Sequence, residues 1–140
     1  MLCQLPGLFG MPYVYGNMNW YNALSQSALT PPGAVFGIVW AVLYVLLGIS
    51  AFYAFRDKIH GRALTLFTGQ LALNACWTPV FFGAHSLTGG LLLIVALAVE
   101  FGFLFGAFWQ VSRKSAWLLV PYGVWLLFAT YLTAVTWWLN

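Results

Sequence analysis

The stretch ALTLFTGQLALNACWTPVFF, from Ala63 to Phe82, decides how this chain folds. Its 20 residues carry no charge, which is enough to cross the hydrocarbon core of a bilayer, about 30 Å thick. Gln70, Asn74 and Trp77 interrupt it at spacings of four and three, so they lie on one face of a helix. Because an unpaired amide in hydrocarbon costs several kcal/mol, we expect this face to look into protein and into a pocket.

The composition of the whole chain favours the same environment. Of the 140 residues, 63% are apolar and 5% are charged, whereas a soluble domain has about 25% charged residues. So few charges cannot cover a surface that faces water. We therefore predict a multi-pass integral membrane protein with a single domain, residues 1–140. The net charge of +3 comes from two short basic segments, and we expect no nucleic-acid partner.

Four apolar stretches are clear membrane spans, and together they predict an all-α fold. They cover residues 33–55, 63–82, 87–110 and 116–139. Residues 2–16 are also apolar, but they number 15 and include Pro6 and Pro12, short of the usual minimum of about 17. This segment is either a shortened, half-inserted first helix or the remnant of a longer one.

The basic residues predict the orientation of the spans. They lie between the first and second clear spans and between the third and fourth, at Arg56, Lys58, Arg62, Arg113 and Lys114. Positively charged loops stay in the cytoplasm. We therefore expect loops 56–62 and 111–115 to be cytoplasmic and residues 17–32 to lie outside.

The outer segment, residues 17–32, is long for a connection in a compact protein, and such loops are often functional. Its aromatic residues Trp20 and Tyr21 suit the headgroup layer of the membrane, or alternatively a lid over a cavity. Pro31 and Pro32 suit the start of the next helix.

Three spans each carry an aromatic face. The residues on these faces are Phe36, Trp40 and Tyr44; Gln70, Asn74 and Trp77; and Tyr122, Trp125, Ala129, Leu132 and Thr136. Apolar pockets with a few polar groups bind ligands, and a flat aromatic ligand would stack on such walls for about 1 kcal/mol per ring pair. Aromatic faces also pack helices together, and amides form interhelical hydrogen bonds, so both interpretations stay open.

Glu100 is the single acid inside a predicted span, and such a group is a functional hypothesis by default. A neutral carboxyl bonded to a neighbouring helix is the alternative. Ala98, Gly102 and Gly106 form a ridge of small residues, which suits packing within the chain or in a homodimer. No carboxylate pair, metal-ligand cluster or phosphate-binding glycine loop is present, so we expect neither acid–base nor metal catalysis.

Several motifs resemble the TspO/MBR family of tryptophan-rich sensory proteins, which includes the translocator protein, or peripheral-type benzodiazepine receptor, of animals. The motifs are Trp20-Tyr21, Pro31-Pro32, residues 36–44, residues 69–74, residues 77–83, Pro121-Tyr122, Trp125 and residues 128–130. The resemblance implies a five-helix transmembrane bundle, often a homodimer. It also implies a pocket near the outer side, closed by the loop after the first helix. It requires no cofactor, and its ligands are porphyrins, haem, sterols and benzodiazepine-like compounds.

The resemblance also implies pocket residues. These are Trp40, Asn74, Trp77, Trp125, Ala129 and Leu132. The helix faces described above add Tyr44 and Gln70. Trp40 and Trp125 match tryptophans linked to porphyrin chemistry. The chain departs from the family pattern at residues 26–29, which lack the aromatic lid residue, and at Thr133, where the family has asparagine. No basic residue follows Tyr131, which argues against cholesterol as the main ligand.

These observations predict a receptor or carrier that binds porphyrin, haem or another flat hydrophobic molecule, in a bacterial cell membrane. Two other functions stay open. Trp40 and Trp125 could exchange electrons with excited porphyrin in a light-dependent degrading enzyme, or Glu100 could serve a proton-coupled transporter.

Overall fold

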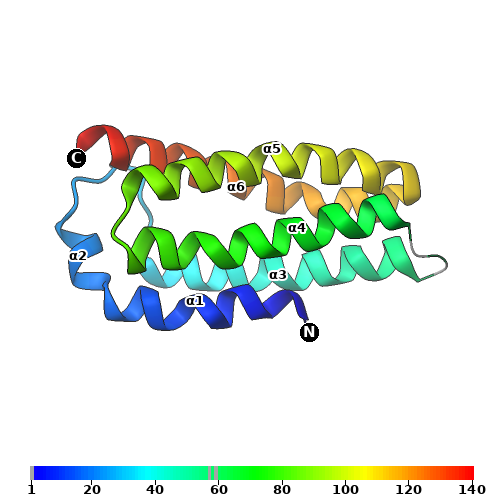
Figure 1. The fold of residues 1–140 in the computed structure, drawn as a ribbon, viewed down its shortest axis with the longest axis horizontal. Helices are drawn as coiled ribbons and strands as arrows, with labels where there is room; N and C mark the ends of the chain where they lie inside the picture. The colour runs from blue at the N-terminus through cyan, green and yellow to red at the C-terminus, as the bar shows by residue number, and fades with distance from the viewer. Residues whose placement is uncertain (1, 57, 59) are drawn as a thin grey trace.

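The computed structural model describes residues 2–56, 58 and 60–140, and every regular element in that part of the chain is helical. Five long helices form a bundle along one axis, and a short helix lies at one end (Figure 1). The bundle helices are α1 (Leu5–Gly16), α3 (Gly33–Phe55), α4 (Gly61–Thr78), α5 (Leu87–Val111) and α6 (Arg113–Leu139). The short elements are α2 (Met18–Ala23), the 3-10 turn η1 (Leu2–Gln4) and the π-helical turn η2 (Pro79–Gly83).

Three helices, α3, α5 and α6, are long and apolar enough to cross a membrane, with 23, 25 and 27 residues. The remaining predicted span is α4, whose 18 residues include Gln70 and Asn74 and are therefore more polar. Pro79 has no backbone N–H, and the α-helical pattern ends at Thr78. η2 continues the helical path to Gly83. The predicted all-α membrane fold is confirmed.

The predicted first helix is α1, and its 12 residues are too short to cross the bilayer core alone. Glycines let α1 lie close to its neighbours. A Cβ added at Gly10 would come within 2.9 Å of Thr78 on α4, and one at Gly7 within 3.0 Å of the Tyr44 ring on α3. α1 therefore forms a wall of the bundle on the α3 and α4 side.

Two predicted loops are shorter than expected, because helices begin earlier. The expected loop 111–115 is wrong: α5 ends at Val111, α6 begins at Arg113, and Ser112 alone joins them. The Ser112 hydroxyl accepts a hydrogen bond from the Ser115 amide at 3.3 Å, so it caps α6. Lys114 therefore lies in the first turn of a helix. Similarly, the 56–62 loop is shortened because α4 begins at Gly61.

The core of the bundle combines apolar packing with polar contacts between helices. Leu47, Leu104 and Phe108 are fully buried where α3, α5 and α6 meet. Beside them, the Ser50 hydroxyl donates to the Ser115 carbonyl at 2.8 Å, and the Ser115 hydroxyl donates to the Ser50 carbonyl at 2.7 Å. Such hydrogen bonds hold helices together in lipid. They fix α3 against α6, two helices that both contribute to the pocket described next.

Candidate ligand-binding pocket

A cavity of about 680 Å³ lies in the half of the bundle nearest α2. Ligand pockets in proteins typically measure about 300–1,000 Å³. None of the described residues that line this cavity is charged, and most are apolar. Six of the predicted ligand-binding residues line it: Trp40, Tyr44, Asn74, Trp77, Ala129 and Leu132. The structure thus brings together residues from three separate spans, as the aromatic faces suggested, and their role in binding stays a prediction.

The Asn74 side chain connects the cavity to a buried polar network. Its amide nitrogen donates to the Tyr122 hydroxyl at 2.5 Å, and its oxygen accepts from the Tyr44 hydroxyl at 3.4 Å. The amide nitrogen of Gln70 also donates to Tyr122, at 2.8 Å. Because a carboxamide has two N–H donors, Asn74 keeps one for a ligand.

Gln70 is placed differently from the expectation. It is fully buried and does not line the cavity. Its side-chain oxygen has no hydrogen-bond partner among the described residues. Gln70 therefore supports the network behind Asn74 and would not touch a ligand in this arrangement.

Aromatic rings form two walls of the cavity. Trp40 packs against Tyr44 and Tyr122, with ring centroids 5.6 Å and 6.2 Å away. Trp77 stacks on Phe81 with ring centroids 4.9 Å apart and an interplanar angle of 12°. The Trp77 indole N–H donates to the Gly90 carbonyl at 2.9 Å, which fixes the ring between α4 and α5.

Trp125 does not line the cavity, although the resemblance placed it there. Its ring contacts Phe36, which does line the cavity, at a centroid distance of 5.6 Å. The Trp125 indole N–H is buried and has no acceptor among the described residues. Trp125 thus lies one layer behind the wall, with an unused donor.

The sequence analysis missed the walls contributed by α1 and η2. Gly7, Gly10 and Met11 line the cavity from α1, and Phe81 and Phe82 line it from η2. Phe81 follows Trp77 by four residues, so the spacing of Gln70, Asn74 and Trp77 could have been extended to it. The α1 residues carried no comparable signal. Thr133 and Thr136 also line the cavity, but each hydroxyl bonds a carbonyl of its own helix.

The segment expected to be a lid contains α2 and is held at both ends. Trp20 stacks on His85 at 4.4 Å, and the Asn17 side chain bonds the His85 ring at 2.7 Å. At the other end, the Asn140 side chain makes two hydrogen bonds to the Ser25 backbone, at 3.0 Å and 2.8 Å. These contacts fix α2 to His85, before α5, and to Asn140, after α6.

Of the four predicted lid residues, only Tyr21 lines the cavity. Burial raises the pKa of the Tyr21 phenol above its ordinary value of 10.0, so this side chain stays neutral. Trp20 does not line the cavity, and its ring contacts His85, Phe81 and Phe82, so a role of this segment as a lid stays a prediction. Pro31 and Pro32 precede Gly33, the first residue of α3, as predicted for a helix start.

We expect Trp20→Ala to accelerate ligand release by about tenfold, because three aromatic contacts of about 0.5–1.5 kcal/mol each hold the lid. Stopped-flow fluorescence after displacement of a bound porphyrin measures this rate. Trp117→Ala is the matched control, since Trp117 is exposed at the other end of the bundle. Equal release rates in the two variants would show that α2 is not a lid.

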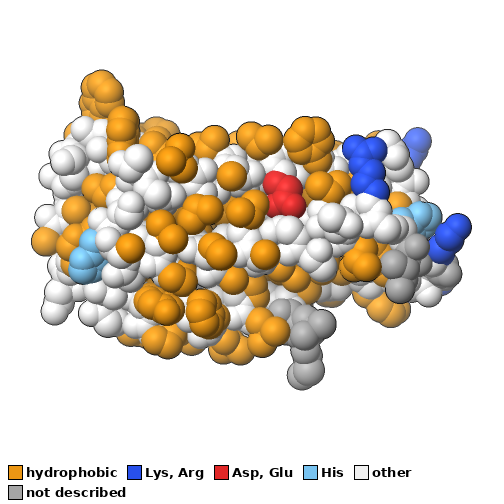
Figure 2. Space-filling view, viewed as in Figure 1, with side chains coloured by type: hydrophobic (Ala, Val, Ile, Leu, Met, Phe, Trp, Pro, Cys, Tyr) orange, Lys and Arg blue, Asp and Glu red, His pale blue; other side chains and the backbone are white. Residues whose placement is uncertain are grey.

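Glu100 lies apart from the cavity. Its carboxylate rests against Gly69 on α4, where a glycine leaves room for it, and one carboxylate oxygen has no partner among the described residues. Figure 2 shows the acidic side chain midway along the outer surface of the bundle. A role of Glu100 in a transport path through the cavity finds no support in this placement.

These observations define a class of protein: an all-helical membrane bundle with an uncharged, aromatic-walled cavity under a short helix. The model of the TspO/MBR family matches residues 1–139, and the chain belongs to this family.

Individual relatives cover most of the chain. It is 35% identical over 142 residues to "Protein CrtK" of Rhodobacter capsulatus, which covers 99% of this chain and 88% of that protein. It is 35% identical over 134 residues to the human "Translocator protein", with 91% and 79% covered. It is 33% identical over 111 residues to the "Tryptophan-rich sensory protein" of Cereibacter sphaeroides, with 79% and 70% covered.

Proposed function

We propose that this protein is a membrane receptor or carrier that binds a flat, hydrophobic tetrapyrrole, a porphyrin or haem, in the cavity beneath α2. The cavity itself carries this proposal: it measures about 680 Å³, none of its described lining residues is charged, and its lining includes Trp40, Trp77 and Phe81. A planar macrocycle would stack on these rings, and the free N–H of Asn74 would bond a polar atom at its edge. Benzodiazepine-like compounds share the flat aromatic character and would occupy the same space. No further cofactor is required.

Binding is favoured over light-dependent degradation of the porphyrin. Degradation by the proposed route would use Trp40 and Trp125 as electron donors. Trp40 lines the cavity, whereas Trp125 does not line it and contacts the lining residue Phe36. Of the two tryptophans that this route requires, the cavity wall therefore presents only Trp40.

We also propose the setting in which the protein works. The basic side chains gather at the end of the bundle opposite α2 (Figure 2), and the positive-inside rule would place this end in the cytoplasm of a bacterial cell. Of the small residues on α5, Ala98 packs against the core, but a Cβ added at Gly102 or Gly106 would meet no atom of the described residues within 4 Å. This open ridge suits the interface of a homodimer.

Protoporphyrin IX should quench the tryptophan fluorescence of the purified protein saturably, and Asn74→Leu should weaken binding by about tenfold, the value of one hydrogen bond of about 1.4 kcal/mol. A fluorescence titration in detergent measures both. Asn22→Leu is the control, because Asn22 is exposed on α2. Quenching that never saturates would show that porphyrin does not bind in this cavity. Equal affinity in the two variants would show that the Asn74 carboxamide does not contact the ligand.

A further inference from the structure

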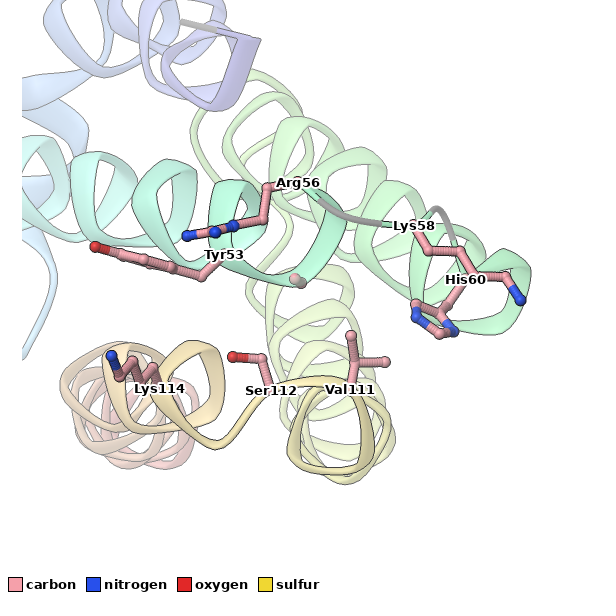
Figure 3. A pocket seen from close by; sticks show the side chains of 8 residues that line it. Tyr53, Arg56, Lys58, His60, Val111, Ser112 and Lys114 are labelled. Carbon is pink, nitrogen blue, oxygen red and sulfur yellow. The ribbon is translucent and has the colours of Figure 1, made fainter.

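A second cavity, of about 240 Å³, lies at the end of the bundle opposite the proposed tetrapyrrole pocket. It is bounded by the end of α3, the connection to α4, the end of α5 and the start of α6. Its described lining residues are Tyr53, Ala54, Arg56, Lys58, His60, Val111, Ser112 and Lys114. Figure 3 shows Tyr53 and Arg56 on one side of this space, with Ser112 and Lys114 on the other.

The charged residues among the described residues that line this cavity are all cationic, whereas Asp57, between Arg56 and Lys58 in the sequence, lies outside the described residues. Arg56, Lys58 and Lys114 are cationic, and no described lining residue is an acid. The cations come from separate elements: Arg56 and Lys58 follow α3, whereas Lys114 belongs to the first turn of α6. Because they are far apart in the sequence, their meeting at one cavity is a product of the fold, beyond the charge of a single basic loop. The hydroxyls of Tyr53 and Ser112 add polar groups at its rim.

The start of α6 strengthens the attraction for an anion. This helix has 27 residues, and its N-terminus carries a partial positive charge. The Ser112 hydroxyl accepts a hydrogen bond from the Ser115 amide at 3.3 Å, and the Ser112 carbonyl accepts one from the Ala116 amide at 3.1 Å. The amide of Lys114, which lines the cavity, is left without an acceptor inside the helix. Phosphate groups bind at helix N-termini of this kind, and more strongly when Arg and Lys side chains join the site.

We propose that this cavity binds a phosphate group, and that the phosphate belongs to an anionic phospholipid at the membrane surface. The spanning helices α3 and α5 end at the cavity and α6 begins there, which places it at the level of the lipid headgroups. Basic pockets between membrane helices at this depth recognise anionic headgroups. A soluble phosphate would satisfy the same cations, and the experiment below separates the two sources. The proposal is independent of what the tetrapyrrole pocket binds.

Two neighbouring residues of equal charge allow a matched comparison. Lys114 lines the cavity, whereas the Arg113 guanidinium lies over the ring of Trp109, 5.4 Å from its centroid, and does not line the cavity. If the lipid binds in the cavity, loss of the Lys114 charge weakens binding and loss of the Arg113 charge does not. Simple attraction between a basic end and an anionic membrane depends on net charge and treats them alike.

The test measures phosphatidylglycerol retained by the full-length protein in a neutral detergent, using native mass spectrometry over a lipid titration, with phosphatidylcholine of the same acyl chains as comparison. We expect saturable retention of phosphatidylglycerol only, weakened about tenfold in Lys114→Gln and in Lys58→Gln and unchanged in Arg113→Gln. Equal losses in Lys114→Gln and Arg113→Gln would overturn the site, as would equal retention of both lipids.

A second arm identifies the source of the phosphate. Inorganic phosphate and glycerol 3-phosphate are titrated as competitors against bound phosphatidylglycerol. A lipid site predicts that neither displaces the lipid at concentrations far above that of the protein. Displacement by either at low concentration would overturn the assignment to a phospholipid and identify a site for a soluble phosphate. Thermal unfolding of each variant, matched to that of the parent protein, shows that the fold is intact.

Discussion

Gly37→Phe will reduce the affinity for protoporphyrin IX by about a hundredfold, because its ring will occupy the space that the ligand needs. Gly37 lines the cavity from α3, and a Cβ added there would meet no atom within 4 Å. The new side chain therefore enters open volume without displacing the helices. A hundredfold loss of affinity corresponds to about 2.8 kcal/mol of binding free energy. Replacing a helical glycine should at the same time leave the fold as stable or slightly more stable.

Val42→Phe is the matched control for this substitution. Val42 lies on the same helix, is 55% exposed and does not line the cavity. Fluorescence titration gives both affinities, and circular dichroism melting in detergent verifies both folds. If Gly37→Phe folds and binds porphyrin as well as Val42→Phe does, the ligand binds elsewhere and the proposed pocket is wrong.

The spans were predictable because membrane helices are read from length and apolarity alone. The expected span 33–55 coincides with α3, and residues 87–110 fall one short of the end of α5. The start of α6 was less predictable. Arg113 and Lys114 resemble a loop by charge, but Ser112 caps the helix directly before them. Local capping therefore decided a boundary that hydropathy could not.

The candidate site was predictable only where helical spacing carries information. Trp40, Tyr44, Asn74, Trp77, Ala129 and Leu132 meet around one cavity because each lies on the inner face of its span. Gln70 lies on the same helix face as Asn74, yet whether a side chain on that face reaches the cavity depends on the residues that it contacts. Gln70 is bonded to Tyr122 and Trp125 packs against Phe36, and neither Gln70 nor Trp125 lines the cavity. Such layering follows from packing between helices, which a single sequence does not encode in its spacing.

The second large effect that we predict concerns the stability of the protein and the hydrogen bonds among Gln70, Asn74 and Tyr122. Tyr122→Phe should destabilise the protein by about 3 kcal/mol, because it removes one oxygen that accepts hydrogen bonds from both Gln70 and Asn74. Gln70 and Tyr122 are fully buried, so water cannot replace the lost acceptor. Each unsatisfied buried donor costs about 1–3 kcal/mol. Unfolding in a titration of sodium dodecyl sulfate, followed by circular dichroism, measures the difference.

A control and a rescue separate this effect from the loss of a hydroxyl as such. Tyr131→Phe changes the same atoms on the same helix, but Tyr131 is 47% exposed, and we expect a change below about 0.5 kcal/mol. Adding Gln70→Leu to Tyr122→Phe should restore part of the stability, because removing both partners of a buried hydrogen bond is far less costly than removing one. Restoration requires that Gln70 and Tyr122 interact in the folded protein. If the double variant is as unstable as the sum of the two single variants, the carboxamides and the phenol are not coupled, and Asn74 loses the support that positions it toward the ligand.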